Sequence, residues 1–405
     1  MITVTEAIQL VAAETRRLEP ERIALTEARG RVLAEDVRAD SDLPPFDRAL
    51  MDGYAVRAAD TADAPVRLRL VGEAAAGRGW RGHLQSGEAV RIMTGAPVPD
   101  GADSVQQVEV TRELADGALV EIDKATQAGQ FITRRATEIV QGETVLRAGT
   151  EINAAMMAAL ASFGHARVLV GARPRVVVLA TGTELVAVDE QPGPDQIRDS
   201  NTYSLRAYAE AAGATVEHLP FAGDDLDALK QLIAEAAARA DALILSGGVS
   251  MGVYDFTKAA LRALDAEIFF ERVSLRPGKP TVFARLQGQR RTLVFGLPGN
   301  PVSVSVTFNL FARTALRAMQ GADDAALAEE QAVLGHAVKG ALERASYLPA
   351  QLRTDDCGRL ICAPLRWGGS SDFVAFTRAD ALLIVDAGVQ MIEAGVVVRV
   401  VRLPA

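Results

Sequence analysis

The stretch that decides the fold is Val176-Val177-Val178-Leu179-Ala180, which runs directly into Thr181-Gly182-Thr183-Glu184. The same change, from a short apolar run to a Gly-rich polar loop, occurs again over residues 242–250 and 292–301. Uninterrupted apolar runs of this length are typical of strands that are buried on both faces of a parallel sheet. Because the carboxyl ends of such strands share one edge, where loops present free backbone N–H groups, the pattern predicts a ligand site there.

Composition limits the class of protein. A chain of 405 residues, 49% hydrophobic and 23% charged, is typical of a globular protein with two to four domains. No apolar run reaches the roughly 18 residues of a membrane span, and the N-terminus lacks signal-peptide features, so we expect a cytoplasmic protein without membrane contact. The net charge of −9 argues against nucleic-acid binding, and the four histidines lack metal-ligand spacing. Cys357 and Cys362 are expected to be small core residues in a hairpin.

Changes in residue pattern divide the chain into four predicted domains. Residues 1–38 and 140–173 have helical spacing and are expected to pack together as a helical domain. Between them, residues 39–139 carry short β-branched runs separated by Gly, Pro and Asp, which predicts an inserted β module. Residues 174–325 alternate strand and helix, and residues 326–405 return to short strands. We therefore predict an α/β domain followed by a second small β module.

Polar residues follow the first two apolar runs. The Glu184 carboxylate is suited to holding a divalent cation or orienting a substrate group, although it is equally typical of a turn or helix cap. The loop Ser246-Gly247-Gly248-Val249-Ser250 offers backbone N–H groups and two hydroxyls, as a phosphate cradle requires, but Gly-Gly pairs are also common in turns. Downstream, Asp255 adds a carboxylate for a metal and Lys258 adds a cation for an anion.

Three further features carry charge or rigidity. In Arg276-Pro277-Gly278-Lys279-Pro280 two cations flank a stiff turn, which indicates either an anion site or a solvated charged turn. The pair Asp224-Asp225 either caps the helix that begins there or serves a metal. In Pro298-Gly299-Asn300-Pro301 two prolines fix the backbone path at a strand end, which suits placement of a ligand. A helix is expected to start at Pro301.

Seven short motifs follow one another along the chain. They are Met51-Asp52-Gly53-Tyr54-Ala55, Arg91-Ile92-Met93-Thr94-Gly95-Ala96, Thr181-Gly182-Thr183-Glu184-Leu185, Asp199-Ser200-Asn201, Ser246-Gly247-Gly248-Val249-Ser250, Pro277-Gly278-Lys279-Pro280 and Leu297-Pro298-Gly299-Asn300-Pro301. Together they resemble the MoeA family of molybdopterin molybdenumtransferases, which is related to the C-terminal part of gephyrin. The resemblance implies a three-layer α/β molybdopterin-binding domain, an elongated homodimer, and an active site between that domain and the first β module of the other subunit. It also implies the reaction of adenylated molybdopterin with molybdate, in the presence of Mg²⁺, to give molybdenum cofactor and AMP.

The resemblance and the chemistry of the residues together suggest roles. The candidate catalytic residues are Asp52, Thr94, Glu184, Asp255 and Lys279. The candidate substrate-binding residues are Gly182, Ser246, Gly247, Gly248, Ser250, Lys258, Arg276, Pro298, Gly299, Asn300, Pro301 and Glu138. Breaking the bond to AMP requires a metal that neutralises developing charge, and the candidates for holding it are Glu184, Asp225 and Asp255. By the resemblance, Asp52, Thr94 and Glu138 belong to the surface that faces the substrate from the β module.

The chain departs from the family pattern at three places. Arg276 stands where the family usually has lysine, which keeps the charge but changes the donor geometry. Arg135-Ala136-Thr137-Glu138 replaces the common Arg-Gly-Glu-Asp, so a longer carboxylate stands in place of aspartate. In the last domain, Tyr347-Leu348-Pro349-Ala350 occupies the position where many relatives carry an Arg-Gly pair. The last change removes a cation from the C-terminal domain.

Two alternative functions stay open at the level of sequence. Related α/β domains occur in molybdopterin adenylyltransferases, which make the adenylated substrate, but those are usually short single-domain chains. A dimeric, non-catalytic molybdopterin-binding scaffold is the second alternative, and the presence of Glu184, Asp255 and Lys279 argues against it. Expected partners are the two substrates, a second copy of the chain, molybdopterin adenylyltransferase and the molybdoenzymes that receive the cofactor.

Overall fold

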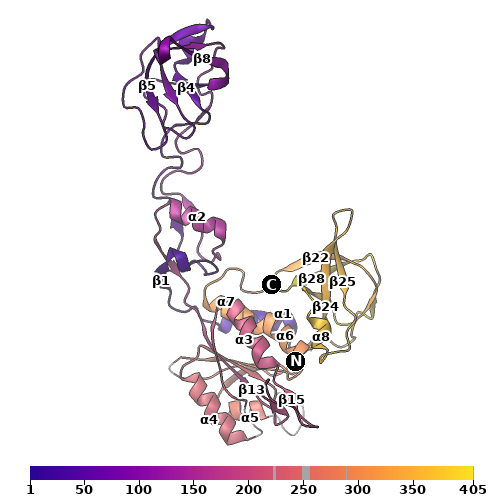
Figure 1. Ribbon diagram of the computed structural model, residues 1–405. Coiled ribbons are helices and arrows are strands. Elements are labelled where there is room, and N and C mark those ends of the chain that lie inside the picture. Colours follow the sequence, from indigo (N-terminus) through magenta and orange to yellow (C-terminus); the bar gives the residue numbers. More distant parts are fainter. Residues whose placement is uncertain (222–224, 249–255, 289, 405) are drawn as a thin grey trace. The chain divides into compact units, whose positions relative to one another are not determined.

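The structure is a computed structural model that describes residues 1–221, 225–248, 256–288 and 290–404. The chain forms two compact units (Figure 1). The first unit contains Met1–Glu35, Ala148–Met157 and Arg167–Ala405, and the second contains Asp36–Arg147 and Ala158–Ala166. The finer division into four domains stays a prediction. No helix in the described part of the chain is long and apolar enough to cross a membrane.

A six-stranded sheet forms the centre of the first unit. Its middle strands are β13 (Arg175–Ala180), β17 (Ala242–Ser246) and β21 (Leu293–Leu297), which are parallel neighbours. The order is β16-β13-β17-β21-β20-β18, with outer strands β16 (Thr215–His218), β20 (Val282–Arg285) and β18 (Glu267–Phe270). Every residue of β17 and β21 is buried, and so is β13 after Arg175. The prediction of parallel strands buried on both faces is confirmed.

Helices cover both faces of this sheet. Alternate side chains of β13 point to opposite faces, so that Val176 and Val178 join one hydrophobic cluster while Val177 and Leu179 join another. The cluster around Val177 contains residues of α4 (Leu226–Ala237) and α5 (Phe256–Ala263). The cluster around Val176 contains residues of α1 (Val4–Glu14), α3 (Asn201–Ala211), α6 (Pro301–Thr307), a π-turn (Phe308–Ala312) and α7 (Arg313–Met319). This three-layer α/β arrangement is the one that the sequence predicts.

Residues 1–38 and 140–173, which the sequence predicts to be helical, contain both helices and short strands in the structure. Within the described residues, α-helix is confined to α1, which Thr3 and Glu6 start with a capping box, and to α2 (Ala154–Ser162), beside one 3-10 turn at Leu25–Glu27. Between these helices the chain forms short strands instead, such as β1 (Glu21–Ala24), which pairs antiparallel with β12 (Arg167–Val170). Pro20 immediately before β1 disfavours continued helix, and the pairing with β12 satisfies the backbone groups.

The second unit is built on a six-stranded sheet in the order β7-β4-β6-β5-β9-β8. Its strands are β4 (Gly53–Val56), β5 (Val66–Ala74), β6 (Glu88–Ile92), β7 (Ser104–Gln107), β8 (Thr111–Leu114) and β9 (Leu119–Ile122). The β module predicted within residues 39–139 is therefore present. Gly53 is required at its place because an added Cβ would lie 1.9 Å from the carbonyl oxygen of Gln106 on the neighbouring strand.

The C-terminal part of the first unit is a second six-stranded sheet, in the order β19-β24-β25-β22-β28-β26. Its strands are β19 (Leu275–Arg276), β22 (Glu329–Leu334), β24 (Ala345–Thr354), β25 (Leu360–Pro364), β26 (Ala381–Val385) and β28 (Val397–Arg402). Because β19 comes from the α/β part and pairs with β24, this sheet is tied to the turn that carries Arg276.

The two cysteines differ in environment. Cys362 is buried in β25, and this burial raises the pKa of its thiol to about 12. Cys357 is exposed in the turn between β24 and β25. The hairpin is confirmed, but the prediction of two core cysteines is wrong for Cys357, because the turn holds that residue at the surface.

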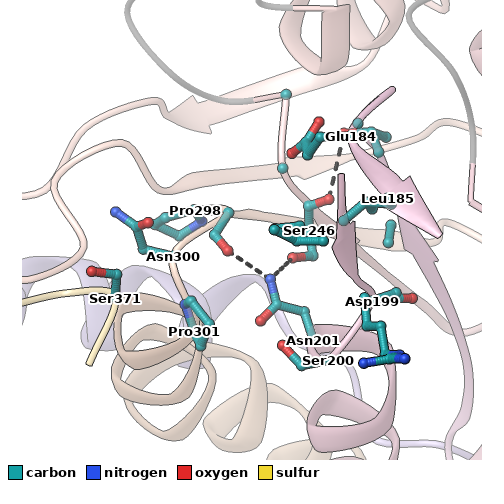
Figure 2. A pocket seen from close by; sticks show the side chains of 18 of the residues that line it. Glu184, Leu185, Asp199, Ser200, Asn201, Ser246, Pro298, Asn300, Pro301 and Ser371 are labelled. Carbon is teal, nitrogen blue, oxygen red and sulfur yellow. Dashed lines mark hydrogen bonds between the residues drawn. The ribbon is translucent and has the colours of Figure 1, made fainter. Parts of the chain in front are cut away.

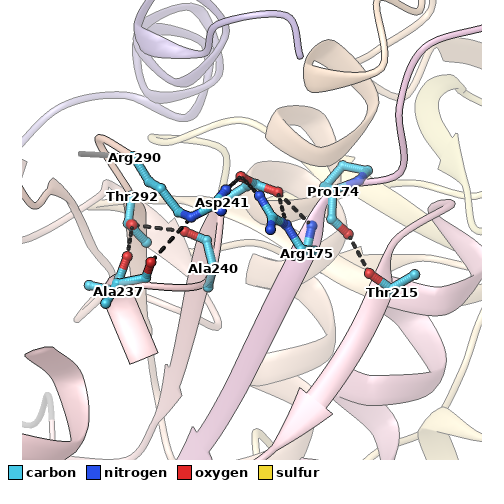
Figure 3. A network of polar contacts seen from close by, with 9 residues as sticks. Pro174, Arg175, Thr215, Ala237, Ala240, Asp241, Arg290 and Thr292 are labelled. Carbon is cyan, nitrogen blue, oxygen red and sulfur yellow. Dashed lines mark hydrogen bonds and ion pairs between the residues drawn. The ribbon is translucent and has the colours of Figure 1, made fainter. Parts of the chain in front are cut away.

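A polar network fixes the amino edge of the central sheet (Figure 3). The backbone N–H of Arg175 donates to Asp241 Oδ2 at 2.9 Å, and the Arg175 guanidinium donates to both carboxylate oxygens. Arg290 lies 3.5 Å from the same carboxylate. The Thr292 hydroxyl lies 2.8 Å from the carbonyl oxygens of both Ala237 and Ala240. These contacts hold the starts of β13, β17 and β21 together, at the edge opposite the Gly-rich loops.

Candidate active site at the carboxyl edge of the central sheet

A pocket of about 890 Å³ opens where β13, β17 and β21 end (Figure 2). The loops that follow all three strands contribute to its walls, as the sequence predicts for a shared carboxyl edge. Its charged lining side chains, among the described residues, are Glu184, Arg198 and Asp199. The remaining polar groups are mostly hydroxyls and amides, such as Ser246 and Asn201. The pocket therefore combines hydrogen-bonding groups for an anionic ligand with at least one carboxylate.

The loop after β17 depends on glycine. Gly247 and Gly248 have φ of 92° and 62°, values that residues with a side chain rarely adopt. A Cβ on Gly247 would also lie 2.4 Å from the carbonyl oxygen of Thr181, on the neighbouring strand end. The loop can therefore pass close to Thr181 only without side chains, which leaves its backbone facing the pocket. Ser250 and Asp255, which the sequence predicts as substrate and metal contacts, lie outside the described residues.

Asn201 joins the loops after β17 and β21 (Figure 2). Its Nδ2 donates to the hydroxyl of Ser246 at 2.9 Å and to the carbonyl oxygen of Gly299 at 2.7 Å. Because a carbonyl oxygen only accepts hydrogen bonds, these contacts fix the orientation of the amide. Asn201 belongs to the motif Asp199-Ser200-Asn201, but it is not among the site residues predicted from the sequence. The one sequence feature that could have indicated a role is its position at the start of a helix, shortly after the strand β15 (Ile197–Arg198).

Glu184 is exposed within the pocket. Its carboxylate has no hydrogen-bond or ion-pair partner in the part of the chain that the structure describes, and it is therefore available to a ligand. Its backbone is held in place, because the N–H of Ile197 donates to the Glu184 carbonyl oxygen at 2.8 Å. Gly182 leaves room for the side chain, since an added Cβ would lie 2.5 Å from Glu184 Oε2. The alternative of a helix or turn cap is not supported by any side-chain contact among the described residues.

Asp225, the other candidate metal ligand that the structure describes, is differently placed. It caps α4, since its Oδ1 accepts the backbone N–H groups of Asp227 and Ala228 at 2.9 and 3.0 Å. It is not among the residues that line the pocket. No group of three or more His, Cys, Asp or Glu side chains suited to a metal occurs within the described ranges. Of the two candidate carboxylates within the described residues, Glu184 is thus the one that lines the pocket.

The predicted cations do not form the described pocket wall. Lys258 is buried on α5, and Arg276 is exposed next to the C-terminal sheet. Lys279 is half-buried and not among the lining residues, whereas its neighbour Pro280 is. Arg198 is the cation that lines the described pocket, and the sequence analysis missed it. Little in the sequence favours the selection of Arg198, because a single arginine before a helix is common on protein surfaces.

The rigid loop after β21 connects the pocket to the C-terminal sheet. Pro298, Gly299, Asn300 and Pro301 all line the pocket, and α6 begins at Pro301 as predicted. The Asn300 side chain donates to the Ser370 hydroxyl at 2.9 Å, and the backbone N–H of Val302 donates to the Ser370 carbonyl oxygen at 3.1 Å. This places the segment after Ser370 at the pocket.

The C-terminal part contributes different residues from those expected. Ser371 and Phe373 line the pocket, and nothing in the sequence analysis indicated them. Tyr347, by contrast, is buried in β24 and is not among the lining residues. The C-terminal part therefore contributes to the pocket wall through the connection between β25 and β26, and not through the strand that carries Tyr347.

The second unit contains the candidate site residues Asp52, Thr94 and Glu138, and it brings the first two into contact. Asp52 Oδ1 accepts hydrogen bonds from the backbone N–H of Thr94 at 2.6 Å and from its hydroxyl at 2.7 Å. These bonds, the backbone one first, hold the pKa of the Asp52 carboxyl below its usual range. Glu138 is engaged separately, by the Arg48 guanidinium at 3.0 Å. The Asp52–Thr94 pair thus presents an ionised carboxylate and a hydroxyl on one surface.

Replacing Ala136 by glycine is expected to stabilise the second unit by about 1 kcal/mol. Ala136 has φ of 62°, in the left-handed region that favours glycine. Urea denaturation should show a higher midpoint for Ala136→Gly. The matched control is Ala128→Gly, an exposed site without positive φ, which should be neutral or slightly destabilising. Equal effects of the two changes would contradict the explanation by backbone strain.

Comparison with known proteins covers nearly the whole chain. A family model described as the MoeA N-terminal region (domain I and II) matches residues 2–164. A model described as a probable molybdopterin binding domain matches residues 177–318, and one described as the MoeA C-terminal region (domain IV) matches residues 331–403.

Individual relatives agree with these models. The chain is 35% identical to a molybdopterin molybdenumtransferase of Bacillus subtilis (strain 168), over 98% of this chain and 93% of that protein. It is 40% identical to a protein of the same name from Nostoc sp., over 75% of this chain and 70% of the relative. A crystal structure of the molybdopterin biosynthesis MoeA protein from Pyrococcus horikosii has a TM-score of 0.84 at 30% identity, with both chains fully covered.

Proposed function

The chain belongs to the MoeA family, and from this premise we propose that it inserts molybdate into adenylated molybdopterin and releases AMP. The product of this reaction is the molybdenum cofactor. The observation that carries the proposal is the pocket at the carboxyl edge of the central sheet, with glycine loops and the exposed carboxylate of Glu184. Each part has a use in a reaction between two anions, because backbone N–H groups bind oxyanions and the carboxylate serves a cation.

Mg²⁺ is proposed as the cofactor, and the donor set fits it. Mg²⁺ is usually held by one or two carboxylates together with substrate phosphates and water, rather than by a cage of protein ligands. The exposed carboxylate of Glu184 is consistent with this mode of binding, whereas Asp199, the other carboxylate of the described lining, is buried and accepts the backbone N–H of Thr202. When bound, the metal would neutralise the negative charge that develops as the link to AMP breaks. Asp255 stays a second proposed ligand from the resemblance.

The residues of the chain itself would position the substrate. Gly247 and Gly248 bring the loop backbone close to the pocket. The Gly247 N–H donates to the carbonyl oxygen of Leu297 at 3.1 Å, so of this pair the N–H of Gly248 would be the one that binds a phosphate. Asn201 holds this loop against Gly299, so that the two walls are fixed before a ligand arrives. Arg198 adds a cation to the wall. Positioning together with charge stabilisation is the main requirement for cleaving a phosphoanhydride bond.

We extend the proposal to the assembly. The family expectation is a homodimer, in which the Asp52–Thr94 pair of one copy serves the pocket of the other. We also expect a cytoplasmic location, contact with a molybdopterin adenylyltransferase and with molybdoenzymes, and no interaction with nucleic acid or membrane.

The test is an assay with adenylated molybdopterin, molybdate and Mg²⁺. We expect AMP release that requires molybdate, together with loss of the adenylated substrate. An adenylyltransferase would instead form adenylated molybdopterin from molybdopterin and ATP, and a scaffold would bind the substrate without releasing AMP. Either of these two results would overturn the proposal.

A further inference from the structure

A smaller cavity of about 250 Å³ adjoins the pocket described above. Its walls come from α3, α6, the π-turn, the short helix α8 (Phe373–Phe376) and the last residues of the chain. Three residues, Ser200, Pro301 and Phe373, line both spaces. The two spaces are therefore adjacent, as a ligand that occupied both would require.

The lining of the smaller cavity is uncharged. None of its twelve lining residues carries a formal charge, whereas Glu184, Arg198 and Asp199 line the larger pocket. Phe373 and Phe376 offer aromatic rings, and hydroxyls come from serine, threonine and tyrosine. Its volume is below the roughly 300–1,000 Å³ of a cavity for a whole small-molecule ligand. The space suits a neutral, planar part of a ligand whose charged part lies elsewhere.

A buried amide in the wall points to a ligand that donates hydrogen bonds. Asn309 lines the cavity and is 1% exposed. Its Nδ2 donates to the carbonyl oxygen of Ser305 at 2.9 Å, which fixes the orientation of the amide, and its Oδ1 has no partner within the described residues. An unpaired buried oxygen costs free energy that a ligand N–H would recover. Asn309 also lies in the π-turn Phe308–Ala312, a deformation of the helix that is frequent at functional sites.

We propose that this cavity binds a neutral amino-substituted heterocycle, which is the ring end of the ligand whose charged end occupies the larger pocket. The inference rests on the proposed function, because adenylated molybdopterin carries two such rings, the adenine and the pterin. Both present amino and ring N–H donors to an acceptor such as Asn309 Oδ1, and both have flat faces for Phe373 and Phe376.

The test fills the cavity without touching the larger pocket. Ser204 on α3 lines the smaller cavity and not the larger pocket, and among the described residues its hydroxyl donates to the Asn201 carbonyl oxygen of its own helix, at 3.0 Å. Ser204→Leu introduces a good helix former whose side chain occupies the space. The matched control is Ala207→Leu, at an exposed position of the same helix that lines neither space.

Binding of three probes is measured by calorimetry on the full chain: AMP, a pterin without a phosphate tail, and inorganic pyrophosphate. Ser204→Leu should weaken either AMP or the pterin about tenfold or more, which identifies the ring, and leave pyrophosphate within about twofold. Ala207→Leu should bind all three like the wild type. The inference is overturned if Ser204→Leu binds both rings normally, if it weakens all three probes alike, or if the wild type binds neither ring. Failure of molybdate-dependent AMP release would instead overturn the proposed function and leave these binding results intact.

Discussion

Replacing Glu184 by glutamine is expected to lower molybdate-dependent AMP release about 100- to 1,000-fold. The substitution keeps the size of the side chain and removes the negative charge that a cation in the pocket requires. Because the carboxylate has no partner within the described residues, its loss should change the free energy of unfolding by less than about 0.5 kcal/mol. The expected result is therefore an inactive enzyme that is as stable as the wild type.

The measurement is AMP release at saturating molybdate over a range of Mg²⁺ concentrations, with urea denaturation of the same preparations. Glu190→Gln is the matched control, because Glu190 is exposed in the nearby loop and does not line the pocket. It should retain wild-type activity. Undiminished AMP release by Glu184→Gln would show that this carboxylate does not serve the metal.

Replacing Gly247 by alanine is expected to abolish AMP release and to lower the free energy of unfolding by about 2 to 4 kcal/mol. The residue has φ of 92°, and the added Cβ would lie 2.4 Å from the carbonyl oxygen of Thr181 and 2.9 Å from its hydroxyl. The carbonyl belongs to the backbone at the end of a buried strand, so it cannot turn away. The loop would have to move out of the position in which it faces the pocket.

Gly299→Ala is the matched comparison on the opposite wall. The nearest atom to its added Cβ is the Cα of Gly247 at 3.8 Å, and its φ is not positive, so the fold should tolerate it within about 0.5 kcal/mol. In urea denaturation, Gly247→Ala should unfold at a lower urea concentration than Gly299→Ala. If Gly247→Ala unfolded at the same urea concentration as Gly299→Ala, close packing of this loop against Thr181 would not be a constraint on the fold.

The strands and the edge at which they place the pocket could be predicted from sequence because the signal is local. An apolar run such as residues 176–180 is compatible with few environments other than a sheet covered on both faces. Likewise, the start of α6 at Pro301 follows from the fixed φ of proline at the first position of a helix. Both are properties of a few consecutive residues.

The walls of the pocket could not be predicted in the same way because they depend on contacts between distant residues. Asn201 reaches a carbonyl oxygen 98 positions later in the chain, and Asn300 reaches a hydroxyl 70 positions later. No local pattern encodes such pairs. The same reason explains why Arg276 and Lys279, which look like pocket cations in the sequence, are absent from the described wall. Pairing of β19 with β24 places Arg276 beside the C-terminal sheet instead.

The attachment of the C-terminal sheet has a consequence for how relatives can diverge. That sheet meets the α/β part through the pairing of β19 with β24, through the Ser370 contacts with the loop after β21, and through buried side chains such as Leu382 and Val401, which belong to the hydrophobic cluster around Val176. Within the described residues, only Ser371 and Phe373 of its sequence line the larger pocket. The chemistry in that pocket therefore constrains a short segment of the module directly, while packing constrains the face that meets the α/β part, and the exposed remainder of the module is where relatives can differ most.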